Sequence, residues 1–226
     1  MPFVLLFVFL FIHQAKASEK FLNVGDVFLV SYPCYLCRAI ELEEGMPYSH
    51  IAMVAKNKYG QWGMVESLKS GFDWVSWNDF WSRKLTGESN VLHIRHVFNA
   101  LKIISFQVME KSYGGTFYDP LFAWGNRDEV GKEKFYCSEL LYKIFQKSLG
   151  KQFHLVPKKM HFDHAFEFWN SYYLGYSAKV PAGELGLSPA DYVKSKDFIV
   201  LKKYNISSDG DAHLLRERVR GKVLLP

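Results

Sequence analysis

The stretch that decides the fold is Tyr48–Leu68, which reads YSHIAMVAKNKYGQWGMVESL. Two apolar runs within it, Tyr48–Lys56 and Gln61–Leu68, have the composition of β-strands. Between them stand the turn-forming residues Asn57-Lys58-Tyr59-Gly60. This pattern predicts a β-hairpin in the first half of the chain.

The length of the hairpin loop decides on which face each side chain lies. With a three-residue loop, Lys58–Gly60, His50 and Glu66 become diagonal neighbours on one face, about 7–8 Å apart and within side-chain reach. A loop of two or four residues would put them on opposite faces. We expect the three-residue loop, because Gly60 stands where that loop needs a left-handed residue.

Further strands and helices are predicted on both sides of the hairpin. Ser138–Leu149 is the clearest helix, because its apolar residues recur at helical spacing and Gly150 follows its end. The others are strands at Val27–Ser31, Val91–Val97 and Asp197–Tyr204, a short helix from Ser76 to about Lys84, a helix from Asn99 to Gly114-Gly115, and a helix at about Asp163–Leu174. Strands and helices mixed without β–α–β alternation indicate an α+β fold, with a mainly antiparallel β-sheet packed against helices.

The N-terminal segment has the features of a secretory signal peptide. Phe3–Ile12 is an unbroken apolar run followed by Ala15-Lys16-Ala17, and it is too short to span a membrane. No basic residue precedes the run, which leaves an uncleaved anchor as the alternative. We expect a signal peptide at 1–17, one domain at 18–204 and a C-terminal tail at 205–226. The mature protein would then be secreted or periplasmic, with no stable membrane span.

Composition and charge exclude some classes of function. Hydrophobic residues make up 49% of the 226-residue chain and charged residues 23%, which is the balance of a globular protein with a core. The net charge of +5 is mild, and Lys and Arg form no block of the kind that binds nucleic acid. We therefore expect no nucleic-acid partner. The sequence does not indicate an oligomeric state.

The three cysteines divide into a pair and a single residue. Cys34 and Cys37 form a C-x-x-C motif within the segment Pro33–Met46, and Cys137 stands alone. The pair fits a disulfide in an oxidising compartment or a thioredoxin-type redox motif, but no β–α–β pattern surrounds it. We interpret it as structural or incidental, in a turn-like segment away from any helix start. Cys137 is the candidate reactive thiol.

Cys137 stands at the start of the predicted helix Ser138–Leu149. The unpaired N–H groups and the dipole at a helix start stabilise a thiolate. His50 could take the proton of such a thiol, and Glu66 would be costly to bury without a partner. Each residue also has a structural explanation: a small apolar cysteine, a core histidine bonded to backbone, and a glutamate on an exposed sheet face.

A series of short motifs supports the catalytic interpretation. They are Gly25-Asp26-Val27, Ser49-His50-Ile51-Ala52, Val65-Glu66-Ser67 with Gly71 and Phe72, Tyr118-Asp119, and Tyr136-Cys137-Ser138-Glu139-Leu140. In this order they resemble the motifs of permuted papain-like hydrolases of the YiiX/YebB group, which belongs with the NlpC-type and lecithin–retinol-acyltransferase-like hydrolases. The resemblance runs from about Gly25 to about Tyr204, and it does not extend to Pro33–Met46.

The resemblance implies a permuted papain-like (NlpC-type) fold and assigns roles to several residues. Cys137 is the implied nucleophile, His50 its base and Glu66 the residue that orients the histidine. The order of histidine, glutamate and cysteine is the permuted one, since ordinary papain-like enzymes place the cysteine first. We also expect Tyr118 and Tyr136 to contact the substrate, while Asp119 is interpreted as a turn cap.

Two histidine pairs invite a metal interpretation that the spacing does not favour. On a strand, an offset of three sends His93 and His96 to opposite faces. His161 and His164 have no identifiable third ligand, and the chain contains no H-E-x-x-H motif. We expect neither a metal nor another cofactor.

Aromatic residues recur at helical spacing in the second half of the chain. They are Phe162, Phe166, Trp169 and Tyr173. We interpret them as a stripe facing the core, with an acyl-binding wall as the alternative.

These patterns together predict a cysteine hydrolase that cleaves an amide or ester through a thioester. The substrate is a small molecule, a peptide, peptidoglycan or a lipid, and the sequence does not choose among them. Two other functions stay open: a non-catalytic module that binds peptidoglycan, lipid or peptide, and a thiol oxidoreductase that uses Cys34 or Cys37.

Overall fold

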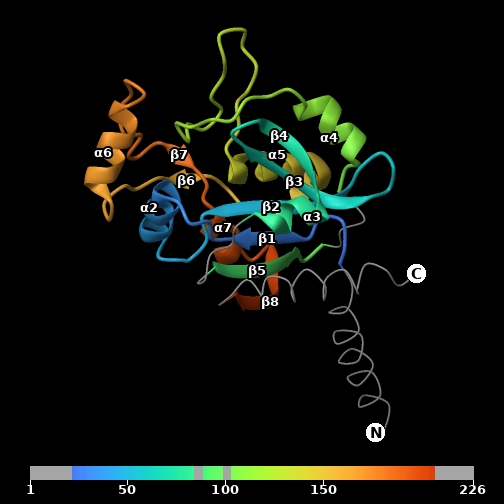
Figure 1. Cartoon of the computed structure of the whole chain (residues 1–226). Coiled ribbons are helices and arrows are strands. Elements are labelled where there is room, and N and C mark those ends of the chain that lie inside the picture. Colours follow the sequence, from blue (N-terminus) through green and yellow to red (C-terminus); the bar gives the residue numbers. More distant parts are fainter. Residues whose placement is uncertain (1–21, 84–88, 99–102, 207–226) are drawn as a thin grey trace, which may run out of the picture.

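The structure is a computed structural model that describes residues 22–83, 89–98 and 103–206 (Figure 1). The predicted signal peptide and the part of the predicted tail beyond Ile206 lie outside these residues. Within the described ranges, no helix is long and apolar enough to cross a membrane.

A six-stranded sheet in the order β4-β3-β2-β1-β5-β8 forms the centre of the fold. Its strands are β1 (Val27–Val30), β2 (His50–Lys56), β3 (Trp62–Leu68), β4 (Gly71–Ser76), β5 (Ser89–His96) and β8 (Phe198–Ile206). Every neighbouring pair is antiparallel, so the predicted α+β fold with a mainly antiparallel sheet is confirmed. Two short strands, β6 (Lys158–Lys159) and β7 (Leu185–Gly186), pair separately.

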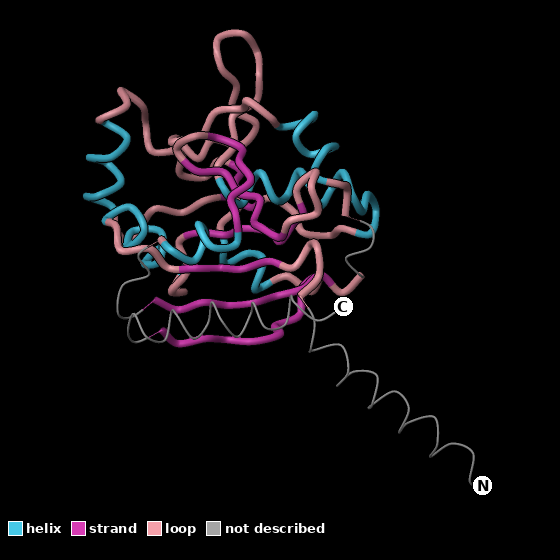
Figure 2. The backbone as a smooth tube through the Cα atoms, turned by 45° about the vertical axis from the view of Figure 1, so that its right-hand side comes forward, coloured by secondary structure: helices cyan, strands magenta, loops and turns pink. Residues whose placement is uncertain are grey.

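Helices cover both faces of the sheet, and others lie beyond one end of its strands. They are α2 (Tyr35–Glu44), α3 (Trp77–Ser82), α4 (Phe106–Tyr113), α5 (Cys137–Leu149), α6 (Phe166–Leu174) and α7 (Pro189–Lys194), with a 3₁₀ turn at Gly150–Gln152. The tube in Figure 2 and the cartoon in Figure 1 both show α2 and α6 side by side at one end, beyond the edge of the strands.

Alternation along the strands builds a separate core on each face of the sheet. Ile51 and Met53 of β2 face α5, where they join a large cluster with Leu140 and Leu141. The intervening residues of β2 face α3 and pack with its three buried aromatic side chains, Trp77, Phe80 and Trp81. This period of two is the usual geometry of a strand buried on both faces.

The predicted hairpin is confirmed with its predicted register. β2 pairs with β3 so that Met53 lies opposite Val65 and Lys56 opposite Trp62, which leaves a three-residue loop between Asn57 and Gln61. Gly60 has φ +76°, the left-handed conformation that this loop needs. His50 and Glu66 therefore share the face that is turned toward α3.

Two predicted helices had wrong limits, and one strand of the sheet was not predicted. Residues 99–102 of the helix predicted from Asn99 lie outside the described residues, and the described helix begins at Phe106, because Ser105 is the N-cap and Ile104 lies before it. The helix predicted at Asp163 begins only at Phe166. β4 was not predicted; it pairs with residues Gly63 to Leu68 of β3 and begins at Gly71, directly after a two-residue turn. Gly71 has φ +85°, and a side chain there would collide with the Thr116 backbone.

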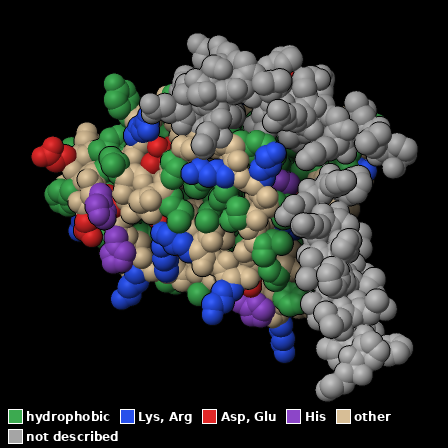
Figure 3. Space-filling view, turned by 90° about the horizontal axis from the view of Figure 1, so that it is seen from below, with side chains coloured by type: hydrophobic (Ala, Val, Ile, Leu, Met, Phe, Trp, Pro, Cys, Tyr) green, Lys and Arg blue, Asp and Glu red, His purple; other side chains and the backbone are tan. Residues whose placement is uncertain are grey.

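The sheet ends at β8, which carries exposed apolar side chains such as Ile199 and Val200. Figure 3, the view from below, shows Lys and Arg side chains spread over this face among hydrophobic ones. On this face, basic residues are not gathered into a single patch.

Candidate active site

The first residue of β2 and the fifth of β3 meet as predicted. His50 Nε2 lies 2.7 Å from Glu66 Oε2, and both side chains are buried. The contact follows from the hairpin register, which places the two residues diagonally on the same face. Glu66 therefore has the partner that a buried carboxylate requires.

Cys137 is the first residue of α5 and forms a hydrogen bond with His50. Because Nε2 of His50 is bonded to Glu66, Nδ1 is the ring nitrogen left for the sulfur. The start of α5 is fixed to β3, since Ser67 Oγ donates a hydrogen bond to the Phe135 carbonyl at 2.6 Å. The structure thus brings Cys137, His50 and Glu66 together in one hydrogen-bonded row.

The start of α5 and the neighbours of His50 determine the electrostatics around Cys137 and His50. Tyr136, the N-cap of α5, makes no side-chain cap, so the first N–H groups of the helix stay open toward the sulfur. Burial lowers the pKa of His50, but its hydrogen bonds to Cys137 and Glu66 outweigh burial and raise that pKa to about 9. His50 is therefore an imidazolium at neutral pH and places a positive charge beside the sulfur of Cys137.

The structure adds a fourth residue, Arg83, that the sequence did not indicate. Its guanidinium lies 2.5 Å from Glu66 Oε1, so the two oxygens of Glu66 are shared between Arg83 and His50. Burial raises the pKa of Glu66, but its contacts with His50 and Arg83 outweigh burial and hold it below the ordinary value. Arg83 follows α3, which packs on the face to which Glu66 points.

Tyr32 completes the surroundings of the histidine. Its ring lies 5.4 Å from the His50 ring, and its hydroxyl accepts a hydrogen bond from Arg83 at 3.5 Å. Burial, followed by the nearby Glu66 carboxylate, raises the pKa of Tyr32 to about 12. Tyr32 is therefore neutral and helps to enclose the imidazole. No motif in the sequence pointed to it, because its position depends on how β1 leads into α2.

A cavity of about 150 Å³ opens beside Cys137. Apolar side chains from several elements line it: Ile40, Phe122, Met160, Phe162, Trp169 and Leu187. Some charged residues at the same cavity pair with one another, as Lys158 does with Asp191 at 2.7 Å, and Lys159 and His161 line it as well. The cavity therefore offers a mainly apolar surface next to the sulfur.

The four aromatic residues expected at helical spacing were interpreted as a core stripe, with a wall of the binding site as the alternative, and the structure divides them between these positions. Phe162, Trp169 and Tyr173 are buried in one cluster, and the first two also line the cavity. Phe166 is 58% exposed and belongs to neither. The cluster is completed by Ala39 of α2, which explains why α2 and α6 lie together.

The two tyrosines expected near the substrate occupy different positions. Tyr136 lines the cavity, and its hydroxyl accepts a hydrogen bond from the Leu187 N–H at 3.1 Å. Tyr118 lies outside the cavity lining and is half-buried. Burial, and after it the neighbouring Cys137, raises the pKa of Tyr118, which places its hydroxyl in the electrostatic neighbourhood of the sulfur. Asp119 accepts hydrogen bonds from the Leu121 and Ala123 N–H groups, which is the geometry of a turn cap.

The expectation for the segment of Cys34 and Cys37 was wrong in its local structure. Cys34 is the N-cap of the ten-residue helix α2, so the pair lies at a helix start and not in a turn. The two sulfurs form a disulfide. The error arose because Pro33 was taken as the mark of a turn, whereas it stands directly before the N-cap of the helix.

The histidine pairs differ in their surroundings. His93 contacts Asp26 at 2.9 Å and stacks on Phe28, while His96 stacks on Phe145, so the two face opposite sides of the sheet as predicted. His164 contacts Glu43 at 3.3 Å. In the described part of the chain, no three His, Cys, Asp or Glu side chains are grouped as metal ligands.

The strand that carries the histidine precedes the helix that carries the cysteine, which is the arrangement of a papain-like fold with a permuted sequence. The chain belongs to the family of permuted papain-like amidase enzymes, YaeF/YiiX, C92 family, whose model matches residues 21–198. This confirms the family suggested by the sequence motifs.

A solved structure gives an independent comparison of the fold. The chain is similar to YiiX from Escherichia coli O157:H7, which is described as a metalloprotein. The TM-score is 0.64 at 18% identity, and the match covers 80% of this chain and 97% of that chain. At this identity the likeness shows the fold alone. No curated protein matches the chain.

Proposed function

We propose that this protein is a secreted cysteine hydrolase that cleaves an amide or ester bond, with Cys137 as nucleophile, His50 as acid and base, and Glu66 as the orienting residue. The observation that carries the proposal is the buried hydrogen-bonded row of these three side chains beside an apolar cavity. A nucleophile, a base and a group that orients the base are the parts that acyl transfer requires.

The reaction would proceed in two steps. The Cys137 thiolate attacks the substrate carbonyl, and the oxyanion forms near the Cys137 N–H at the start of α5. The C–N or C–O bond breaks as the His50 imidazolium gives its proton to the leaving group, and a thioester remains on Cys137. Neutral His50 then takes a proton from water, the hydroxide attacks the thioester carbonyl, and the acid leaves while Cys137 regains the thiolate.

The cavity supports an apolar group on the substrate. Such a group would remove its lining of aliphatic and aromatic side chains from water, and two of the lysines at the cavity, Lys158 and Lys194, are already paired with carboxylates.

Acyl probes test the proposal directly. The full chain would be treated with probes that share a reactive carbonyl and differ in head group and in the length of an apolar chain. We expect covalent labelling of Cys137 in the wild type and none in Cys137→Ala, with faster labelling for apolar groups that fit the cavity. A folded wild type that binds the probes but forms no adduct with any of them would identify a non-catalytic binding module instead.

The raised pKa of His50 predicts the alkaline limit of activity. The leaving group needs the imidazolium proton, so kcat/KM should fall as the pH rises through about 9, where His50 loses that proton. Alkylation of Cys137 by iodoacetamide should not fall over the same range, because the thiolate persists. Measuring both profiles on one preparation separates loss of the acid from loss of the nucleophile. An alkaline limit near 7 would contradict the assignment.

We expect the two cysteines of α2 to be dispensable for hydrolysis. Cys34 and Cys37 are bonded to each other, and only Cys137 among the three cysteines lines the cavity in the described part of the chain. Cys34→Ser/Cys37→Ser should therefore keep kcat/KM close to the wild-type value, with circular dichroism as the check on folding. A folded double variant without activity would show that the pair takes part in the chemistry.

Secretion makes a separate prediction. The apolar run Phe3–Ile12 and the Ala15-Lys16-Ala17 motif place the cleavage site before Ser18. We expect the intact mass of exported protein to correspond to a chain that begins at Ser18. A mass that includes Phe3–Ile12 would show that the segment is an uncleaved anchor.

A further inference from the structure

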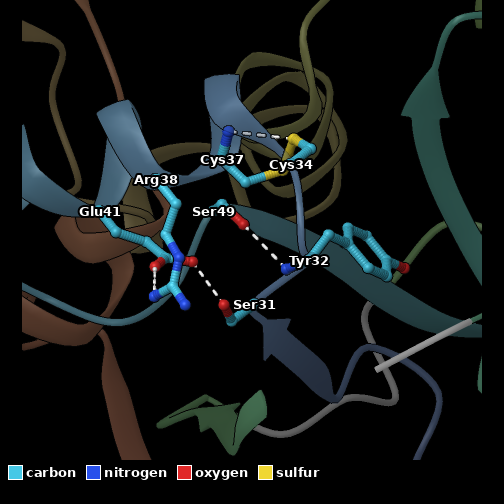
Figure 4. Close-up of a disulfide and its surroundings, with 7 residues drawn as sticks. All are labelled: Ser31, Tyr32, Cys34, Cys37, Arg38, Glu41 and Ser49. Carbon is cyan, nitrogen blue, oxygen red and sulfur yellow. Dashed lines mark hydrogen bonds and ion pairs between the residues drawn. A yellow bond between two sulfur atoms is a disulfide. The ribbon is translucent and has the colours of Figure 1, made fainter. Parts of the chain in front are cut away.

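The Cys34–Cys37 disulfide stands at the surface start of α2 (Figure 4). Cys34 is exposed, as are its neighbours Pro33 and Tyr35, whereas Cys37 is buried. The Cys37 N–H donates a hydrogen bond to the Cys34 sulfur at 3.0 Å, so Cys34 caps the helix. The two cysteines joined by this bond therefore differ in their access to solvent, and only Cys34 accepts a hydrogen bond from the start of the helix.

The helix does not depend on the disulfide for its position. Ser31 donates a hydrogen bond to the buried Glu41 carboxylate, which ties the middle of α2 to the end of β1. At its other end, Glu43 accepts hydrogen bonds from the Ala165 N–H at 2.8 Å and from the Trp169 indole at 3.1 Å. The disulfide closes a loop with only two residues between its cysteines, and such a short loop restricts the unfolded chain little. The bond can therefore open while α2 stays in place.

We propose that Cys34–Cys37 is a redox-active disulfide that exchanges with external thiols at the Cys34 sulfur. Exchange needs a sulfur that an attacking thiolate can reach and a helix start that stabilises the thiolate formed there. Cys34 has both properties. Cys37 is shielded and serves as the resolving partner. This activity is separate from the hydrolysis proposed above, because it uses neither Cys137 nor His50.

The exchange is balanced with two equivalents of a thiol RSH. A thiolate attacks the Cys34 sulfur, and the bond between the two protein sulfurs breaks with its electron pair passing to Cys37, which takes a proton from solvent. A second thiolate attacks the outer sulfur of the mixed disulfide, RSSR leaves, and Cys34 keeps the electron pair as a thiolate. The pair gains two electrons, which the two thiols supply, and the reverse sequence reoxidises it.

Reduced glutathione is the probe for the test. The full chain carrying Cys137→Ala would be incubated with millimolar glutathione without denaturant, quenched in acid, alkylated and weighed. We expect the dithiol to form while the circular dichroism of the helices stays unchanged. A bond that opens only in denaturant, or a helical signal that is lost on reduction, would show a structural disulfide and overturn the proposal.

Two matched variants in the same Cys137→Ala background test which sulfur is attacked. With oxidised glutathione, Cys37→Ser should acquire one glutathione on Cys34. Cys34→Ser, which keeps only the buried Cys37, should acquire it at least tenfold more slowly. Equal rates for the two variants would contradict the assignment of Cys34 as the point of exchange. Neither result depends on hydrolysis, so failure here leaves the proposed function standing.

Discussion

Replacing His50 by alanine is expected to slow alkylation of Cys137 at neutral pH and to lower hydrolysis by about 10²- to 10⁴-fold. In the wild type, the buried imidazole is hydrogen-bonded to both Cys137 and Glu66, and its pKa of about 9 keeps it protonated beside the sulfur. Without this cation, the thiolate at neutral pH loses its main partner. The measurements are the iodoacetamide labelling rate at pH 7, by mass, and kcat/KM with the best acyl probe.

The pH dependence and a second histidine provide the controls for this variant. At a pH of about 10, where an ordinary thiol is ionised, His50→Ala should label as fast as the wild type, which shows that Cys137 stays accessible. His164→Ala removes an exposed histidine outside the cavity lining and should change neither rate. If His50→Ala labels at the wild-type rate at pH 7, His50 is not the partner of the thiolate.

The part of the site that the sequence predicted depends on local geometry. Gly60 set the length of the hairpin loop, and the loop length set the side of the sheet to which His50 and Glu66 point. The regular apolar spacing after Cys137 placed it at a helix start. Each inference used residues within one hairpin or one helix. The meeting of the hairpin with the helix came from the family resemblance and not from the spacing.

The part that the sequence did not predict depends on contacts between distant segments. Arg83 reaches Glu66 only because α3 packs on one particular face of the sheet, and no local pattern around Arg83 indicates that face. The cavity is formed by α2, α6 and the loops before α5 and α7, which are brought together by the tertiary fold. Glu43 shows the same limit, since its partners lie more than a hundred residues away.

The second prediction with a large effect is a loss of stability when Arg83 is replaced. Glu66 is buried, and its two oxygens contact Arg83 and His50. In Arg83→Met the carboxylate stays buried with one partner lost, and we expect the free energy of unfolding to fall by about 3 kcal/mol. Arg83→Lys should recover part of this loss because it restores a cation. Arg127→Met, which removes an exposed arginine whose partner Glu133 keeps its contact with Lys143, should change the free energy of unfolding by less than about 0.5 kcal/mol.

Glu66→Gln separates the two contributions of this carboxylate. We expect it to lower kcat/KM by up to about 100-fold, less than His50→Ala, because the amide weakens the orientation of the imidazole but leaves the base in place. Its effect on stability should be smaller than that of Arg83→Met, since the buried carboxylate is then removed and Arg83, whose side chain is 27% exposed, can turn to solvent.

The double variant Glu66→Gln/Arg83→Met decides whether the ion pair or the general packing holds the site together. If Arg83 serves to neutralise Glu66, a glutamine that needs no counter-ion should cancel part of the cost of losing Arg83. The double variant should then be more stable than the sum of the single losses predicts, by about 1–3 kcal/mol. Its hydrolysis should stay as low as that of Glu66→Gln, because the charged partner of His50 is still missing. Denaturant unfolding of all four proteins measures the coupling, and strictly additive losses would mean that Arg83 acts through packing and not through the charge on Glu66.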